Sequence, residues 1–317
     1  MWKVTEMNKY LPEGSLINTH TNYELISSMG GLEYALQNGV ILEAPAVICD
    51  HNFDLHIELP CGMTGIIPKS EVQHSTNGEA TKDIAILTRV GKPVCFKVVG
   101  FKKDAGGADI AILSRRSAQI ECISQYISTL MAGDIIQARI THLENFGAFA
   151  DIGCGIISLL SIDCISVSRI SHPSSRINVG ESIYAVVKSI GDMGRIYIST
   201  KELLGSWEEN AACFKEGETV RGIIRSIEDY GIFVELKPNL AGLAEYQSDV
   251  HIGQTAAVYI KSILPEKMKI KLIIIDVSNT PTVTAPMSYF INPNEVNHIT
   301  AWKYSPVLCK RIIESTF

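Results

Sequence analysis

Several features that mark common protein classes are missing from this sequence. Aromatic residues make up only 7% of the 317 residues, and the formal net charge of −6 argues against a generally basic coat for nucleic acid. None of the eight cysteines forms a C-x-x-C pair or has metal-ligand spacing with a histidine. The closest two, Cys154 and Cys164, are expected to be idle thiols. We therefore expect no metal and no cofactor.

Signals for membranes, secretion and catalysis are also absent. No apolar run approaches the roughly 18 residues that a membrane helix needs. The segment Met1–Glu6 carries an early acid and no apolar core, unlike a secretory signal. The sequence has no glycine-rich phosphate loop, no H-E-x-x-H and no G-x-S-x-G motif, and no segment outside its repeats is long enough for a catalytic domain. We therefore expect a soluble, cytoplasmic protein that is not an enzyme and does not contact a membrane.

What the sequence does contain is an internal repeat. The segments 133–140 and 145–152 return as 217–224 and 229–236, both at an offset of 84 residues. An offset shared by both halves of the pattern indicates duplication of one structural unit. Further along, the turn 179–181 returns as 252–254 at an offset of 73, so the later copy has a shorter connection.

A fainter copy precedes these two. The string Thr64–Ile67 lies 90 residues before Cys154–Ile157, and Asp54–Leu59 alternates polar and apolar residues like a half-buried strand. This copy lacks the aromatic-Gly-x-Phe element of the others.

Each copy is predicted to be a small closed barrel. It reads as five short strands separated by glycine-containing turns, and closure removes the open edges that so small a sheet would expose. We predict an all-β protein of three tandem five-stranded OB-fold barrels. The predicted parts are an N-terminal extension at 1–35, a divergent repeat at 36–118, repeats at 131–204 and 216–279, and a C-terminal tail at 280–317.

Two connectors between the barrels are expected to be helical. In the first, Arg116–Leu130, an apolar stripe is formed by Ile120, Ile123, Ile127 and Leu130. In the second, the stripe is Leu203, Trp207, Ala211 and Phe214, with a capping box at Ser199–Glu202. The tail, with Trp302 and Tyr304, docks a partner, extends an RNA track or, as the simpler alternative, packs against the third barrel.

Two pairs of rings stand on the second strand of the later copies, Phe146/Phe149 and Tyr230/Phe233. Aromatic faces of this kind stack single-stranded bases, at roughly 1–3 kcal/mol per base. Residues i and i+3 of a regular strand point to opposite faces, so one ring of each pair would be buried. A bulge at Gly147 or Gly231 would instead turn both rings outward. Both alternatives remain open at this stage.

Basic residues recur near these rings. Arg139, Arg221 and Arg225 lie on the first strands, Lys188 and Lys261 match on the fourth, and Arg195 and Lys269 match on the last. Strand alternation would place several of them on one face, where they would contact phosphates. His142, Arg169, His172 and Arg176 gather around the long connection of the second copy, where a histidine either stacks on a base or shapes the loop.

With these motifs assembled, the segment from Gly133 to Lys201 resembles the S1 RNA-binding domain family, typified by bacterial ribosomal protein S1 with its tandem S1 repeats. The resemblance rests on 145–152, on 169–173 leading to 179–181, and on 194–199. The third copy is similar through 221–236 and 240–245, and the first is a more distant member ending at 113–116. The resemblance covers about residues 36–279 and implies S1-type OB barrels.

The resemblance also implies where RNA binds. Family members use strand-two aromatics, a strand-three histidine, and an aspartate and an arginine near strand five. Here Ser158 and Glu245 stand at the histidine position, Gly191 at the aspartate position, and Ile110 at the arginine position of the first copy. The candidate RNA-binding residues are Phe146, Phe149, Arg195, Arg139, Lys188, His142, Tyr230, Phe233, Arg221 and Lys269.

We therefore predict a non-catalytic binder of single-stranded RNA of the ribosomal protein S1-like type. Its expected partners are messenger RNA and the ribosome, and its expected role lies in translation or RNA metabolism. The alternative is a protein-interaction scaffold whose barrels have little affinity for RNA, a reading that the net charge of −6 and Glu245 favour.

Overall fold

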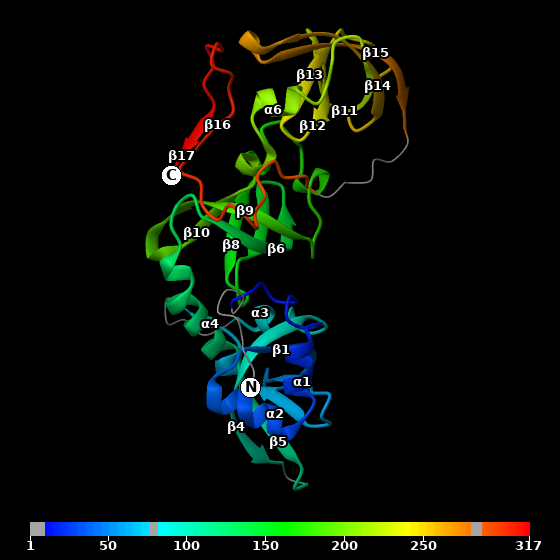
Figure 1. The fold of residues 1–317 in the computed structure, drawn as a ribbon. Coiled ribbons are helices and arrows are strands. Elements are labelled where there is room, and N and C mark those ends of the chain that lie inside the picture. The colour runs from blue at the N-terminus through cyan, green and yellow to red at the C-terminus, as the bar shows by residue number, and fades with distance from the viewer. Residues whose placement is uncertain (1–9, 76–81, 105, 280–286) are drawn as a thin grey trace. The chain divides into compact units, whose positions relative to one another are not determined.

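The structure is a computed structural model and describes residues 10–75, 82–104, 106–279 and 287–317 (Figure 1). The expectation about Met1–Glu6 lies outside these residues. The chain divides into two compact units. Unit 1 comprises Met1–Leu130 with Asp151–Ile157, and unit 2 comprises Met131–Ala150 with Ser158–Phe317.

Unit 1 is built around one closed barrel of five strands. In order these strands pair as β1-β2-β3-β5-β4, with β3 and β5 parallel and the other pairs antiparallel, which is the OB topology. The elements are α1 (His20–Ile26), α2 (Met29–Asn38), β1 (Leu42–Cys49), β2 (Leu55–Glu58), β3 (Thr64–Ile67), η2 (Lys69–Glu71), α3 (Asp83–Leu87), β4 (Pro93–Lys103), β5 (Asp109–Ser114), α4 (Arg115–Gln125) and η3 (Ile127–Thr129).

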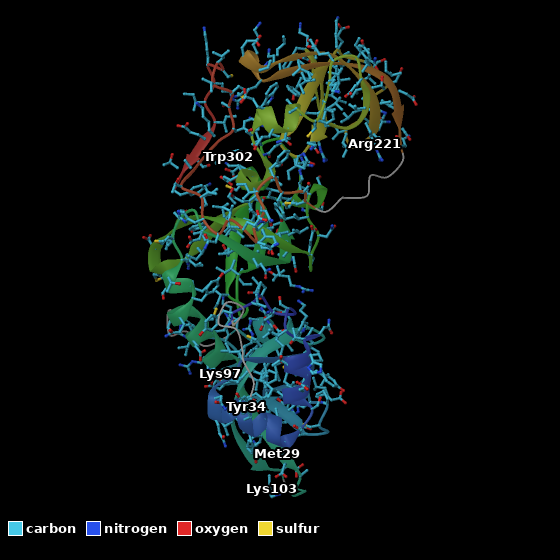
Figure 2. All side chains as sticks on the ribbon, viewed as in Figure 1. Met29, Tyr34, Lys97, Lys103, Arg221 and Trp302 are labelled. Atoms are coloured by element: carbon cyan, nitrogen blue, oxygen red, sulfur yellow. The ribbon has the colours of Figure 1, made fainter. Side chains whose placement is uncertain are left out.

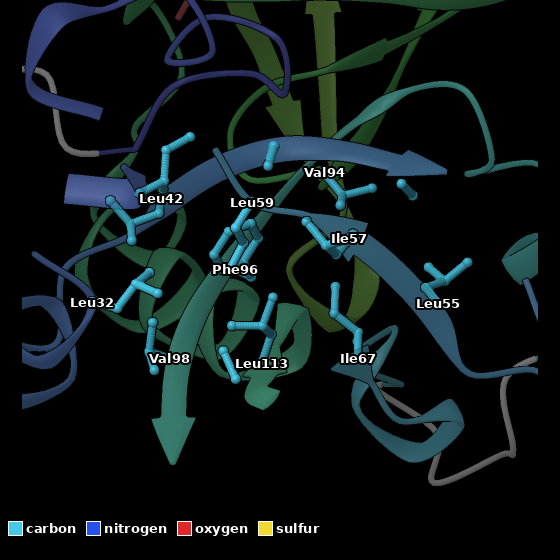
Figure 3. Packing of buried hydrophobic residues seen from close by; sticks show 14 of the residues in the cluster. Leu32, Leu42, Leu55, Ile57, Leu59, Ile67, Val94, Phe96, Val98 and Leu113 are labelled. Carbon is cyan, nitrogen blue, oxygen red and sulfur yellow. The ribbon is translucent and has the colours of Figure 1, made fainter. Parts of the chain in front are cut away.

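The core of this barrel comes from alternate residues of its strands. Leu55 and Ile57 of β2 point inward beside Phe96 of β4 and Leu113 of β5, and all four are fully buried (Figure 3). Leu32 of α2 packs into the same cluster, so part of the predicted N-terminal extension belongs to the first barrel. The alternation recognised in the sequence thus corresponds to a real inward face.

Unit 2 contains two further closed barrels and a C-terminal hairpin. The barrels pair as β6-β7-β8-β10-β9 and β11-β12-β13-β15-β14, the same order as in unit 1, which confirms three tandem OB-fold barrels. The elements are β6 (Ile135–Glu144), β7 (Gly147–Asp151), β8 (Ile157–Ser161), α5 (Ile162–Ile165), η4 (Pro173–Ser175), β9 (Ser182–Ile190), η5 (Asp192–Gly194), β10 (Ile196–Ser199), η6 (Lys201–Leu204), α6 (Trp207–Ala211), β11 (Thr219–Glu228), β12 (Gly231–Lys237), β13 (Leu240–Ala244), β14 (Thr255–Leu264), η7 (Pro265–Lys267), β15 (Lys269–Ser278), β16 (Ala301–Lys303) and β17 (Glu314–Thr316).

The first connector is helical, and the predicted stripe is buried at Ile127 and Leu130 but wrong at Ile120. Helix α4 buries Ala118, Gln119 and Cys122, whereas Ile120 is 42% exposed. Its buried face includes Arg115 and Gln119, whose polar groups are satisfied by Glu13 and by the carbonyl oxygen of Cys154. An apolar pattern cannot reveal a buried face that contains polar residues with distant partners.

The second connector is two short helices rather than one. Leu203 and Trp207 are buried as expected, but η6 ends before Gly205, whose φ of +81° breaks the helix. The capping box is formed by Ser206 and Glu209 at the start of α6, not by Ser199–Glu202. Ser199 instead donates its hydroxyl to the carboxylate of Glu202.

Asn239, in the turn between β12 and β13, links several parts of unit 2. Its side-chain oxygen accepts the N–H of Val167 at 2.9 Å, and its amide donates to the carbonyl oxygens of Lys201 at 2.8 Å and Gly205 at 2.9 Å. Tyr304 donates its hydroxyl to the Asn239 carbonyl. Trp302 and Tyr304 are buried in the core of the third barrel, so the tail packs there, as the simpler alternative predicted.

Across the described residues, every helix is too short or too polar to cross a membrane.

Candidate nucleic-acid interface

The two rings of the second barrel lie together on its outside. Phe146 occupies the turn before β7 and is 56% exposed, while Phe149 lies on β7 and is half-buried. Their ring centroids are 6.0 Å apart at an interplanar angle of 86°. Because β7 begins at Gly147, Phe146 precedes the strand and strand alternation does not apply to it. The alternative with one buried ring is therefore wrong.

Gly147 makes this turn possible because the backbone runs very close to β8. A Cβ atom at Gly147 would lie 2.4 Å from the carbonyl oxygen of Leu160, well inside contact distance. Any side chain here would push β7 away from β8. The rings are thus turned outward by a tight turn that requires glycine, and not by a bulge at this glycine.

The third barrel repeats the arrangement. Tyr230 is 69% exposed, Phe233 is half-buried, and their centroids are 6.1 Å apart at 88°. A Cβ atom at Gly231 would lie 2.4 Å from the carbonyl oxygen of Ala244. The same geometry in two barrels shows that the aromatic-Gly-x-Phe string specifies one local structure.

His142 adds a third ring to the second barrel. Its imidazole is stacked on Phe149, with centroids 6.4 Å apart and an interplanar angle of 19°, and its Nε2 lies 2.7 Å from Oε1 of Glu144. In the third barrel Ser226 stands opposite Phe233, so the third ring is missing. We call Phe146, Phe149 and His142 the ring cluster of the second barrel.

Strand register shows which residues continue this face across the barrel. In the third barrel Phe233 pairs with Leu243, which pairs with Lys271. In the second barrel Leu159 pairs with Tyr197 in the same way. Tyr197 and Lys271 were missed in the sequence, although each follows a predicted cation, Arg195 or Lys269, by two residues and so shares its face.

The cations differ in how near they come to the rings. Arg195 and Lys269 are exposed just before or at the start of the fifth strand of each barrel, and among the described residues Arg195 has no ion-pair partner. Arg139 lies two residues before Thr141, whose hydroxyl donates to the carbonyl oxygen of Phe149 at 3.1 Å. These positions put Arg139 on β6, next to β7, and Arg195 just before β10, which β8 separates from β7.

Lys188 stands farther round the second barrel. Its Nζ donates to Sγ of Cys164 at 2.9 Å, and Cys164 lies in the short helix α5. The first N–H of α5 donates to the carbonyl oxygen of Phe146. The hydrogen bond to Cys164 raises the pKa of Lys188, so its ammonium group stays charged at neutral pH.

Arg221 is not brought to the rings of the third barrel. It pairs with Ala257, and it precedes Ser226, the residue opposite Phe233, by five positions along β11. Its guanidinium donates to the hydroxyl of Thr255 at 3.3 Å, and it lines a separate cavity with Arg225 and Glu235.

The positions where this chain departs from the S1 pattern also have a structural account. Ser158 is buried and donates its hydroxyl to the carbonyl oxygen of Ile196 at 2.7 Å, so it is not part of the face. A Cβ atom at Gly191 would lie 2.9 Å from the ring of Tyr197, so the tyrosine occupies the space of the missing aspartate. Glu245 is exposed in the third barrel.

The first barrel has more rings at these positions than the sequence suggested. His56 pairs with Ile66, which pairs with Ile112, so His56 stands where Phe233 does and Phe53 stands where Tyr230 does. The aromatic-Gly-x-Phe string is absent from this copy, but Phe53 supplies one ring at the position of Tyr230, and this ring was missed in the sequence. Nζ of Lys69 lies 4.3 Å from the centroid of the Phe53 ring.

Comparison with known proteins agrees with this geometry. Residues 129–201, which include the second barrel, match the S1 RNA binding domain family, so this segment of the chain is of the S1-domain type. Curated proteins that it resembles include versions of small ribosomal subunit protein bS1. It is 31% identical to bS1 of Staphylococcus saprophyticus over 53% of this chain and 44% of that protein. It is 30% identical to the bS1 homolog of Bacillus subtilis over 68% of this chain and 55% of that protein.

The chain spans about half the length of these curated relatives. Among solved structures, a multidomain protein with nucleic acid binding domains from Streptococcus pneumoniae aligns over 81% of this chain and 76% of its own length, at 14% identity and a TM-score of 0.23. A TM-score this low supports no structural comparison.

Proposed function

We propose that this chain binds single-stranded RNA by stacking bases on the exposed rings of its second and third barrels. One observation carries the proposal. Two barrels each present an exposed ring and a half-buried ring at right angles near the start of the second strand, with a cation just before or at the start of the fifth strand, Arg195 or Lys269. Rings that accept any base and cations that neutralise phosphates are the two requirements of single-strand binding.

The three barrels contribute unequally. The second offers the three rings of its ring cluster with Arg195 and Tyr197, and we assign it the largest share of the affinity. The third offers two rings with Lys269 and Lys271, against the exposed carboxylate of Glu245. The first has Ile110 and Ile112 where the third has lysines, so it contributes little. We propose the boundaries 36–118, 131–204 and 216–279 for the three repeats, with Leu32 of the preceding extension packed into the core of the first.

The relatives are proteins of the small ribosomal subunit. By this likeness the RNA is messenger RNA, the second partner is the ribosome, and the protein acts in translation in the cytoplasm. Its role is binding rather than catalysis.

This proposal is tested by measuring how RNA binding depends on salt concentration and on whether the competitor is single-stranded or double-stranded. Binding of a fluorescently labelled single-stranded RNA is measured by anisotropy between about 50 and 200 mM salt, with unlabelled single strand or blunt duplex as competitor. We expect log K to fall linearly with log salt, at roughly 0.7 per phosphate neutralised. We expect the single strand to compete better, because paired bases cannot splay onto the rings. Binding that ignores salt, or no binding at all, would leave the protein-scaffold alternative.

A further inference from the structure

A second cationic surface lies in unit 2, where Glu235 follows Phe233 by two positions along β12 and Arg221 lies farther along β11. It is a cavity of about 580 Å³ lined by β11, β12, η4 and residues of the C-terminal extension, and its side chains include Ser174, Arg221, Lys237 and Phe290. Pockets of roughly 300–1,000 Å³ are the usual size for small ligands.

Two of its arginines share one carboxylate. Arg225 donates to Glu235 through Nε at 2.9 Å and Nη2 at 3.1 Å, and Arg176 donates to the same carboxylate through Nη1 at 2.7 Å and through Nη2. One negative charge therefore faces two positive charges. This group of three buried or half-buried side chains carries an excess of one positive charge.

Two further cations line the cavity without a carboxylate. Arg221, labelled in Figure 2, donates to Thr255, and Nζ of Lys237 lies 3.1 Å from Sγ of Cys213 and 5.1 Å from the centroid of the Phe290 ring. Among the described residues that line this cavity, Glu235 is the only acid. The lining thus carries a positive charge in a chain whose net charge is −6.

The remaining lining groups suggest the kind of anion. Guanidinium groups bind phosphate oxygens through two parallel hydrogen bonds, and the hydroxyls of Ser174 and Ser175 can donate to the same oxygens. Phe290 also lines this cavity, and the residue is 39% exposed. A phosphate next to a flat ring is the chemistry of a nucleotide.

We propose that this cavity binds the phosphate of a nucleotide, with Arg221 and Lys237 as its cations and Phe290 beside the base. The nucleotide is either a unit of an RNA strand or a free molecule. In the RNA case the proposal rests on the function proposed above, because the strand must already bind this protein. In the free case it stands independently.

The test uses the full chain and two probes. Calorimetry measures binding of uridine diphosphate, with inorganic pyrophosphate as a base-free comparison, and anisotropy measures binding of a labelled single-stranded RNA at several salt concentrations. The test variant is Arg221→Ala with Lys237→Ala. Lys92→Ala with Lys102→Ala removes the same charge from exposed sites of unit 1 and is the matched control. Arg221→Lys with Lys237→Arg keeps the charge, and circular dichroism reports folding.

The two sources of the nucleotide give different results. If a free nucleotide is the ligand, the test variant binds uridine diphosphate at least about tenfold more weakly than the control does, because two charge-assisted contacts are lost. If RNA is the ligand, the test variant instead shows a log–log salt slope shallower by roughly 1.4, two phosphates at about 0.7 each. The charge-keeping variant should retain most of the wild-type affinity for uridine diphosphate and most of the wild-type salt slope.

The cavity assignment is overturned if the test variant and the control bind both probes equally. Failure of the proposed RNA function looks different, because the wild-type chain then binds no RNA at any salt concentration while uridine diphosphate still reports on the cavity.

Discussion

Arg176 and Glu235 form a buried, bidentate ion pair that joins the loop after η4 in the second barrel to strand β12 of the third. Nη1 of Arg176 donates to Oε1 of Glu235 at 2.7 Å, and each side chain is only 5% exposed. Arg225 reaches the same carboxylate from β11. Together with Asn239, this pair makes the two barrels parts of one unit.

Removing the shared carboxylate should therefore destabilise unit 2. Glu235→Ala leaves two guanidinium groups in a buried site without a counter-charge, which costs roughly 3–5 kcal/mol. Urea unfolding followed by fluorescence of Trp207, which is buried in this unit, measures the change. The exposed Glu245→Ala is the control and should unfold like the wild type. Equal midpoints for the two variants would show that the pair does not stabilise the unit.

A buried glutamate should make unit 1 less stable as the pH rises. Burial raises the pKa of Glu43 to about 7 from 4.5. The N–H groups of Gly14, Leu16 and Ile17, which donate to its carboxylate, act in the opposite direction and lower this pKa. The folded chain holds this proton where the unfolded chain has released it. Glu43 thus contributes stability below pH 4.5 that is lost as the pH rises toward about 7.

The upward shift in the pKa of Glu43 sets how much stability is lost. At about 1.4 kcal/mol per pKa unit, the loss is roughly 3 kcal/mol in all. Glu43→Gln should abolish it, while the exposed Glu33→Gln should not. Chemical unfolding at intervals from pH 4.5 to 7.5 compares the slopes. A Glu43→Gln protein with the wild-type slope would assign the pH dependence to other groups.

The tight turn before the rings depends on glycine. In Gly231→Ala the new Cβ would lie 2.4 Å from the carbonyl oxygen of Ala244, so β12 and β13 must separate locally. Overpacking of this kind costs roughly 1–3 kcal/mol. Gly100→Ala, where a Cβ meets nothing within 4 Å, is the control for thermal unfolding. A melting temperature unchanged by Gly231→Ala would mean that the turn accommodates a side chain.

Arg195 should act on RNA through its charge alone. Arg195→Ala should weaken binding of single strands regardless of sequence and make the log–log salt slope shallower by about 0.7, the contribution of one phosphate. Arg195→Lys should restore most of both. Anisotropy titrations at four salt concentrations give the slopes, and a slope equal to that of the wild type would remove Arg195 from the interface.

The sequence predicted the barrels because the fold repeats. A shared offset of 84 residues and strands of alternating polarity do not depend on distant contacts. The second barrel's ring pair was predicted for the same reason, since Phe146-Gly147-Ala148-Phe149 is a local string.

What the sequence did not reveal depends on partners far along the chain. The buried face of α4 includes Arg115 because Glu13 lies 2.6 Å from its Nε, and Arg176 is buried because Glu235 pairs with it. Arg221 was grouped with Tyr230 and Phe233 because all lie in one repeat, and only the register of β11 shows their separation. Tyr197 was missed because its place depends on pairing with Leu159.

Removal of the two phenylalanine rings tests the central claim most directly. Phe146→Ala with Phe149→Ala is compared with Tyr23→Ala, which removes a similarly exposed ring from unit 1, by titration of labelled single-stranded RNA. Because each stacked base contributes roughly 1–3 kcal/mol, the double variant should bind at least about tenfold more weakly and the control should bind like the wild type. A folded double variant with wild-type affinity would contradict the account.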